Sequence, residues 1–208
     1  MLKHGSARYT TLLVRPWTAA DAVGLREAID EDVDHVRPWL SWALEEPASL
    51  ERTRERLLGY EDQFRRGEAF RYAITRRDLP SLILGGAHVN CRVGPAARDI
   101  GYWVRKSAVR QGIAAAATAA LAVDVFGRPD VDRLIIHCDV ANEASAALAR
   151  ALGFEDMGTR TIAYPNGAPR PIREFELTRT RYRAEHAPMF RDRARRVRLV
   201  TGTAAAQR

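Results

Sequence analysis

The segment Ser107-Ala108-Val109-Arg110-Gln111-Gly112-Ile113-Ala114 lies at the centre of the predicted domain, where it joins a strand-like stretch to an alanine-rich helix. A loop that turns into a helix presents unpaired backbone N–H groups and the positive end of the helix dipole, which suits a phosphate. Gly112 and the small Ala114 let such a ligand approach the backbone. Arg110 and Lys106 add positive charge. The segment therefore indicates a pyrophosphate site, although it matches neither GxxxxGK[ST] nor GxGxxG.

Strand and helix patterns alternate on both sides of this loop. Apolar alternation with β-branched residues predicts strands over 8–15, 69–76, 82–91, 98–105, 133–139, 154–164 and 170–178. Capping residues and apolar periodicity predict helices over 19–29, 49–66, 113–126 and 143–152. Pro165-Asn166-Gly167 predicts a hairpin turn. This order predicts one α/β (α+β) domain over residues 1–183, with a mixed, mostly antiparallel sheet flanked by helices.

The composition is that of a globular protein, with 46% apolar residues in a chain of 208. No run approaches the roughly 18 apolar residues of a membrane span. The N-terminus lacks the apolar stretch of a signal peptide, so we expect a cytoplasmic protein with no membrane contact. Cys91 and Cys138 fit neither a metal spacing nor a disulfide framework, and we expect both to be free thiols.

The net charge of +7 is concentrated near the C-terminus. Residues 184–208 hold six arginines and two acidic residues, a charge of +4, which leaves +3 for the rest of the chain. This segment lacks a clear apolar period, so we expect a basic tail, disordered in part. Such a tail is suited to a weak electrostatic contact with RNA.

Three further segments stand at fixed places around the phosphate loop. Ile100-Gly101-Tyr102-Trp103-Val104 precedes it, and Asn142-Glu143-Ala144-Ser145 with Gly153-Phe154 follows it. The stretch Arg37-Pro38-Trp39-Leu40-Ser41-Trp42-Ala43 lies well upstream. In this order the motifs resemble the GNAT N-acetyltransferase superfamily, and within it the RimJ/RimL-type branch. The resemblance covers about residues 8–180.

The resemblance implies a binding mode for acetyl-CoA. The strand that carries Trp103 and Val104 is expected to splay from its parallel neighbour, residues 133–139, and to receive the pantetheine arm in the V-shaped gap. The pyrophosphate is expected on Val109, Arg110, Gln111, Gly112, Ile113 and Ala114, with Asn142 as a further cofactor residue. The family places Arg or Gln where this chain has Val109, a departure that leaves the backbone N–H groups in place.

The resemblance also suggests catalytic residues. An amine acceptor is mostly protonated at neutral pH and needs a base, for which Asp99 on the central strand is the expected carboxylate. Some relatives carry a glutamate where this chain has Tyr164. Ser145 is the expected proton donor to the departing thiolate, since the tyrosine of other relatives is replaced by Ala149. Asn142 and Ser145 could equally serve only to cap a helix.

The acceptor groove is expected to use aromatic and polar side chains. Trp39 and Trp42 lie three residues apart and either line this groove or pack in the core. Asn90 shares a strand face with His88, and Tyr164 lies near the hairpin turn. We therefore expect Trp39, Trp42, Asn90 and Tyr164 to bind the acceptor. His35, His88 and His137 fit no ligand spacing, so no metal is implied.

Three functions follow as alternatives. The first is transfer of an acetyl group from acetyl-CoA to a primary amine, either a protein N-terminal α-amine, of the ribosomal-protein type, or a small molecule. The second is acetylation of an RNA-borne amine such as aminoacyl-tRNA. The third is a non-catalytic acyl-CoA-binding module, which the residues at Ala149 and Tyr164 leave open. Homodimers are frequent in the family, and the sequence does not identify the acceptor.

Overall fold

The computed structural model describes residues 11–201 apart from 32, 92 and 164–166. Its strands form one eight-stranded sheet in the order β6-β7-β5-β4-β3-β2-β1-β8. Pairing is antiparallel except between β4 and β5 and between β1 and β8. The strands are β1 (Leu12–Pro16), β2 (Ala69–Arg76), β3 (Ile83–Asn90), β4 (Ala97–Val104), β5 (Arg133–Asp139), β6 (Glu155–Ala163), β7 (Pro169–Thr178) and β8 (Val197–Leu199). The predicted mixed, mostly antiparallel sheet is confirmed.

The two central parallel strands separate after a short pairing. Ala97 to Asp99 of β4 pair with Arg133 to Ile135 of β5, and the register goes no further. Beyond Asp99, β4 stays paired with β3, whereas β5 stays paired with β7. The backbone of residues 100–104 therefore faces β5 without a strand partner on that side, which confirms the predicted V-shaped splay.

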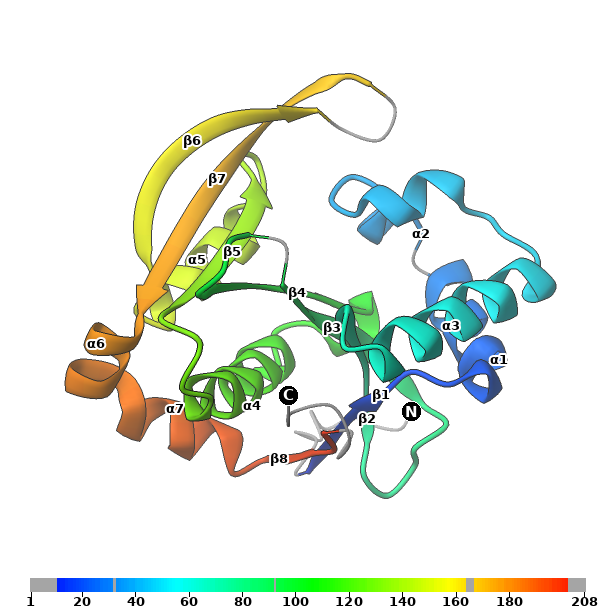
Figure 1. Ribbon diagram of the computed structural model, residues 1–208. Helices are drawn as coiled ribbons and strands as arrows, with labels where there is room; N and C mark the ends of the chain where they lie inside the picture. Colours follow the sequence, from blue (N-terminus) through cyan, green and yellow to red (C-terminus); the bar gives the residue numbers. More distant parts are fainter. Residues whose placement is uncertain (1–10, 32, 92, 164–166, 202–208) are drawn as a thin grey trace, which may run out of the picture.

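Helices cover both faces of the sheet (Figure 1). On one face α4 (Ile113–Gly127), α5 (Glu143–Ala151) and α7 (Ala187–Ala194) share a core with the sheet. On the other face α1 (Ala22–Asp30) and α3 (Leu50–Arg65) pack around Trp17, Leu57 and Ile83. The short α2 (Val33–Val36) and a 3₁₀ turn (Ser41–Glu45) continue this layer, and α6 (Arg179–Arg181) follows the last long strand.

The composition of α4 brings it close to the sheet. Its buried residues include Ala116, Ala117, Ala119, Ala120 and Ala122. Small side chains let a helix axis approach the strands closely, and this places the N-terminus of α4 directly beside the end of β4. The helix positions the phosphate loop by packing rather than by a side-chain cap, since Gly112 occupies the N-cap position.

The C-terminal segment belongs to the domain, contrary to the expected boundary at residue 183. Phe190 of α7 is fully buried and contacts the ring of Tyr182 edge-on at 5.3 Å. β8 extends the sheet by parallel pairing with β1. The sequence pattern missed this because a few apolar residues are separated by arginines. The predicted disorder of the far end concerns residues 202–208, which lie outside the described residues, as do residues 8–10 of the first predicted strand.

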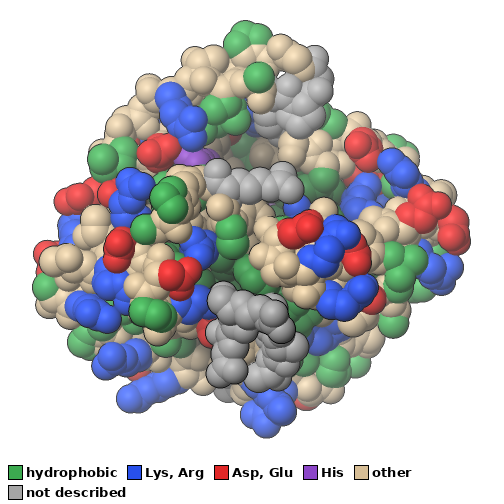
Figure 2. Space-filling view, viewed as in Figure 1, with side chains coloured by type: hydrophobic (Ala, Val, Ile, Leu, Met, Phe, Trp, Pro, Cys, Tyr) green, Lys and Arg blue, Asp and Glu red, His purple; other side chains and the backbone are tan. Residues whose placement is uncertain are grey.

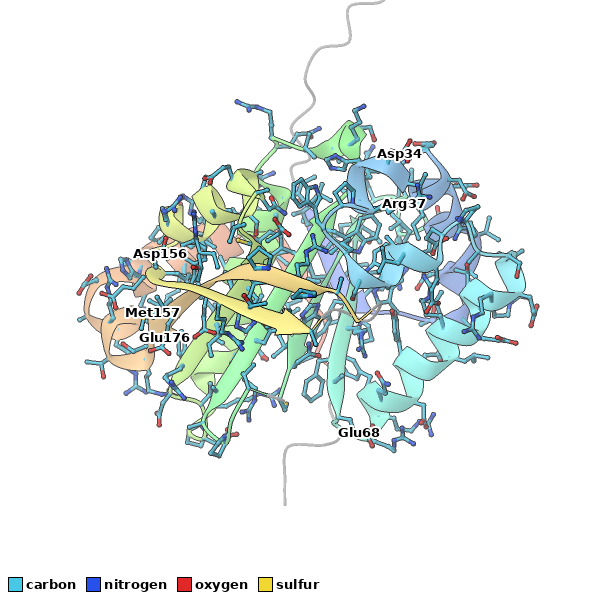
Figure 3. The ribbon with its side chains drawn as sticks, turned by 90° about the horizontal axis from the view of Figure 1, so that it is seen from above. Asp34, Arg37, Glu68, Asp156, Met157 and Glu176 are labelled. Carbon is cyan, nitrogen blue, oxygen red and sulfur yellow. The ribbon has the colours of Figure 1, made fainter. Side chains whose placement is uncertain are left out.

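β6 and β7 form a long hairpin that rises from the sheet toward residues 33–40, which comprise α2 and the turn after it and are called the α2 segment below (Figure 1). Seen from above, Asp156 and Met157 lie at its base, while Asp34 and Arg37 lie on the α2 segment on the other side (Figure 3). The register shifts between Asp156 and Thr159, where Asp156 accepts a hydrogen bond from the Gly158 N–H.

No helix in the part of the chain that the structure describes is long and apolar enough to cross a membrane.

Candidate functional site

A cleft of about 760 Å³ runs along the splayed strands. Its walls come from β3, β4 and β5, the α2 segment, the start of α4 and α5, and the hairpin. Figure 2 shows a hollow beneath the hairpin, which is at the top of this view, and a histidine side chain is visible there. The predicted site residues that line the cleft are Trp39, Trp42, Asp99, Trp103, Val104, Val109, Arg110, Gly112, Ile113, Ala114, Asn142 and Ser145.

The phosphate loop has an unusual backbone. Gly112 adopts φ = +72°, and Arg110 adopts φ = +62°, the only positive φ of a non-glycine residue in the described part of the chain. Left-handed conformations next to a helix start turn successive N–H groups toward one concave surface, which is the geometry of an anion nest. The carbonyl of Gln111 accepts a hydrogen bond from Nη1 of Arg196 at 3.4 Å. The C-terminal segment thus supports the loop from outside.

Asn142 and Gln111 have structural roles at this end of the cleft. The side-chain oxygen of Asn142 accepts from the Ser145 N–H at 3.1 Å and caps α5. Asn142 lines the cleft as well, so capping and ligand contact are compatible. The side chain of Gln111 is not among the lining residues and donates instead to the Ser107 carbonyl at 3.4 Å.

A tyrosine and a serine meet where β4 faces α5. The hydroxyl of Tyr102 lies 3.0 Å from Oγ of Ser145. Burial raises the pKa of Tyr102 well above its usual value, so this phenol keeps its proton. Cys138 lines the cleft nearby, and burial raises the pKa of its thiol also. Tyr102 belonged to a recognised motif, but only the pairing of β4 with its neighbours shows that it reaches Ser145.

Asp99 is the centre of a network of ionisable groups. Its Oδ2 lies 3.1 Å from Nε2 of His88, and its Oδ1 lies 3.2 Å from Nδ1 of His137. Asn90 donates to the same carboxylate at 3.3 Å. Nε2 of His137 lies 2.8 Å from Glu174. Asn90 lies directly opposite Asp99 on β3 and is not among the residues that line the cleft, so its predicted contact with the acceptor stays a prediction.

The network sets the protonation states. Burial by itself would raise the pKa of Asp99, but hydrogen bonds with His137 and His88 outweigh burial and hold that pKa well below its usual value. For His137, burial lowers the pKa, but the carboxylates of Asp99 and Glu174 outweigh it and raise the pKa. Asp99 is therefore an ionised hydrogen-bond acceptor, and His137 is held between two carboxylates.

His88 has room for its ring because its cross-strand neighbour is glycine. A Cβ at position 101 would lie 2.1 Å from Cε1 of His88, so any other residue there would displace the ring. His88 lines the cleft, and its Nδ1 has no hydrogen-bond partner among the residues described. The sequence showed that His88 and Asn90 share a face, but not that Asp99 lies opposite Asn90 and within hydrogen-bond distance of His88.

Aromatic side chains form the acceptor side of the cleft. The rings of Trp42 and Trp103 contact edge-on, with centroids 5.8 Å apart. Trp39 is 37% exposed and lines the cleft with Trp42. These positions are compatible with the predicted contact of both tryptophans with the acceptor. Tyr164 lies outside the described residues.

Arg170 joins the two sides of this cleft. Its Nε donates to Asp139 at 2.6 Å, and its Nη2 donates to the Pro38 carbonyl. One side chain therefore connects the hairpin, the end of β5 and the α2 segment. The sequence pattern missed Arg170, because residues 38 and 170 are brought together only by the fold.

The sequence profile of the acetyltransferase (GNAT) domain matches residues 11–155, and the chain belongs to this family of N-acetyltransferases. It is 28% identical over 182 residues to YdaF of Bacillus subtilis, named as a ribosomal N-acetyltransferase, covering 84% of this chain and 94% of YdaF.

Solved structures of RimL-type enzymes are similar. RimL, the ribosomal L7/L12 α-N-protein acetyltransferase, was solved with coenzyme A and is 28% identical, with a TM-score of 0.71 over 81% of this chain and 94% of RimL. The Salmonella typhimurium acetyltransferase that modifies the N-terminal serine of L7/L12 is 28% identical, with a TM-score of 0.69 over 81% of this chain and 95% of that enzyme.

Proposed function

We propose that this enzyme transfers the acetyl group of acetyl-CoA to the N-terminal α-amine of a protein such as a ribosomal protein. The observation that carries the proposal is that one cleft contains both the phosphate loop and the network around Asp99. The names of the similar structures, an α-N-protein acetyltransferase of L7/L12 and an enzyme that modifies the N-terminal serine of L7/L12, support the choice of acceptor. A small-molecule amine would fit the same chemistry.

The residues of the cleft fit a CoA thioester. The left-handed backbone at Arg110 and Gly112 and the N-terminus of α4 suit the pyrophosphate. The unpaired edge of residues 100–104 suits the amides of the pantetheine arm. The acyl group would then lie between Tyr102 and His88, which both line the cleft. We assign Trp103 and Val104, on this edge, and Asn142, at the N-terminus of α5, to cofactor binding.

We assign the base to His88, with Asp99 as its positioning residue. The depressed pKa of Asp99 makes its carboxylate a weak proton acceptor, which argues against its expected role as the base. If Nε2–H of His88 donates to Asp99, the lone pair of Nδ1 is free to take a proton from the acceptor ammonium. The neutral amine then forms the new C–N bond, and the C–S bond breaks.

We assign the proton donor to the Tyr102–Ser145 pair. The high pKa of Tyr102 keeps a proton on the pair at neutral pH, where the departing thiolate needs one. Ser145 keeps its predicted role, now shared with Tyr102. A thiolate is a tolerable leaving group, so loss of this donor is expected to reduce the rate less than loss of the base.

Acceptor-dependent release of CoA thiol from acetyl-CoA tests this function. The panel should contain peptides with free N-termini, the same peptides with blocked N-termini, small amines and aminoacyl-tRNA. Turnover of free but not blocked peptides supports the proposal. Turnover of aminoacyl-tRNA alone would instead favour the RNA-borne amine, and equal turnover of free and blocked peptides would contradict an α-amine acceptor.

A further inference from the structure

The acceptor side of the cleft contains a guanidinium group with no carboxylate partner. Arg71 of β2 lines the cleft, and its guanidinium lies 4.5 Å from the ring centroid of Tyr60. It donates to the side-chain oxygen of Gln63, which is neutral. Among the described residues, no carboxylate forms an ion pair with Arg71, whose contacts are Gln63 and the ring of Tyr60. Its positive charge is therefore left for a ligand.

Arg71 stands beside the proposed base. In the antiparallel pairing of β2 and β3, Arg71 is directly opposite His88. Directly opposed residues have Cβ atoms roughly 5 Å apart and project to the same face of the sheet. A group bound by Arg71 is thus within a few bond lengths of an amine that gives its proton to His88.

A second arginine borders the same region from α3. Arg56 lies over the ring of Trp42, with 5.7 Å between its guanidinium carbon and the ring centroid. Its Nη1 donates to Glu46 at 2.9 Å, and Glu46 also pairs with Arg26, which pairs in turn with Asp30. Nη2 of Arg56 is buried and has no hydrogen-bond partner among the described residues, and it lies 4.0 Å from Oε2 of the exposed Glu45.

Arginine side chains outnumber carboxylates among the residues that line the cleft. The carboxylates that line it are Asp99, which is bound by two histidines, and Asp139, which is bound by Arg170. Arg56 lies over the ring of Trp42, and Arg71 lies over the ring of Tyr60. A guanidinium in such a partly dry, aromatic setting binds a carboxylate through two parallel hydrogen bonds more strongly than it binds water.

We propose that Arg71, assisted by Arg56, forms an anion subsite that selects acceptors carrying a carboxylate close to the reactive amine. The inference rests on the proposed function and specifies its substrate class. The carboxylate belongs either to an acidic side chain in the first residues of a peptide or to the α-carboxylate of a free amino acid. An acceptor with a lysine or arginine in the same place is disfavoured, because its charge would face Arg71.

The test separates binding from turnover. Peptides that start with Ser-Asp or Ser-Asn, identical elsewhere and amidated at the C-terminus, would be N-acetylated to give products whose binding needs no catalysis. With CoA present, calorimetry should give a Kd about tenfold lower for the Asp product than for the Asn product. In the Arg71→Gln variant the two Kd values should become equal, and Arg71→Lys should restore part of the difference. Arg54→Gln, on the exposed side of α3, should leave the difference unchanged.

Turnover identifies the source of the carboxylate. A lower KM for the free Ser-Asp peptide than for Ser-Asn assigns it to the peptide side chain, whereas a lower KM for a free amino acid than for its amide assigns it to the α-carboxylate. Equal Kd values for both products in the wild-type enzyme, together with equal KM values for a free amino acid and its amide, would overturn the subsite, even if every acceptor is acetylated. Selective binding without any acetyl transfer would instead keep the subsite and contradict the proposed function.

Discussion

The network through Asp99 links the cleft to the far side of β5. Asp99 accepts hydrogen bonds from His88 and Asn90 on one side and contacts His137 on the other, so both of its oxygens are occupied. A carboxylate held in this way fixes the tautomer and orientation of an imidazole rather than taking a proton itself. The proposed proton transfer therefore depends on the pair His88 and Asp99, not on either side chain alone.

Replacement of Asp99 tests this pair. Asp99→Asn removes the charge that fixes the His88 tautomer, and we expect kcat to fall roughly 10²-fold while the KM for acetyl-CoA stays constant. Steady-state thiol release measures both. Asp130→Asn, at an exposed carboxylate paired with Arg98, is the matched control and should leave kcat unchanged. An Asp99→Asn enzyme with wild-type kcat would remove the pair from the mechanism.

His137 should make stability depend on pH. Its pKa is raised in the folded state, so its contribution to the free energy of unfolding is fully present below its unfolded pKa of about 6.5 and is lost as pH rises through the folded value. We expect His137→Gln to destabilise the protein more at about pH 5.5 than at about pH 9. Urea denaturation at both pH values measures this difference. An equal loss at both would show that His137 contributes no proton-linked stability.

Most elements could be predicted from local patterns. β2 and β5 match the expected ranges 69–76 and 133–139 residue for residue, because alternation and flanking turns define both strands. The C-terminal elements could not be predicted, since the apolar side chains of α7 are interleaved with arginines. The network around Asp99 was equally hidden, because it depends on the register that sets Asn90 against Asp99, and on the parallel pairing of Asp99 with Ile135.

We expect α7 to contribute to the stability of the whole domain. Phe190 is fully buried against α4 and Tyr182, and Phe190→Ala should lower the free energy of unfolding by about 3–5 kcal/mol. Denaturant unfolding measures the loss. Leu58→Ala on α3 removes a side chain that is 51% exposed and should cost far less. If both variants lost the same small amount, α7 would not be part of the cooperative domain.

At the scale of the whole molecule, the site is shared between the matched GNAT region and the residues that follow it. The profile covers residues 11–155 and includes the phosphate loop, β4 and the proposed base. Residues beyond it supply Glu174 to the histidine network, Arg170 to the acceptor side and Arg196 to the phosphate loop. The hairpin and C-terminal segment therefore complete a cleft that the common fold opens between β4 and β5.

We propose that this cleft acetylates a protein N-terminus. The most direct measurement is mass spectrometry of a ribosomal-protein N-terminal peptide after incubation with acetyl-CoA, with wild-type enzyme and the Asp99→Asn variant side by side. We predict one acetyl group on the α-amine with wild type, much slower addition with the variant, and none on the same peptide with a blocked N-terminus. Absence of acetylation by the wild-type enzyme, or equal acetylation by both enzymes, would contradict the account.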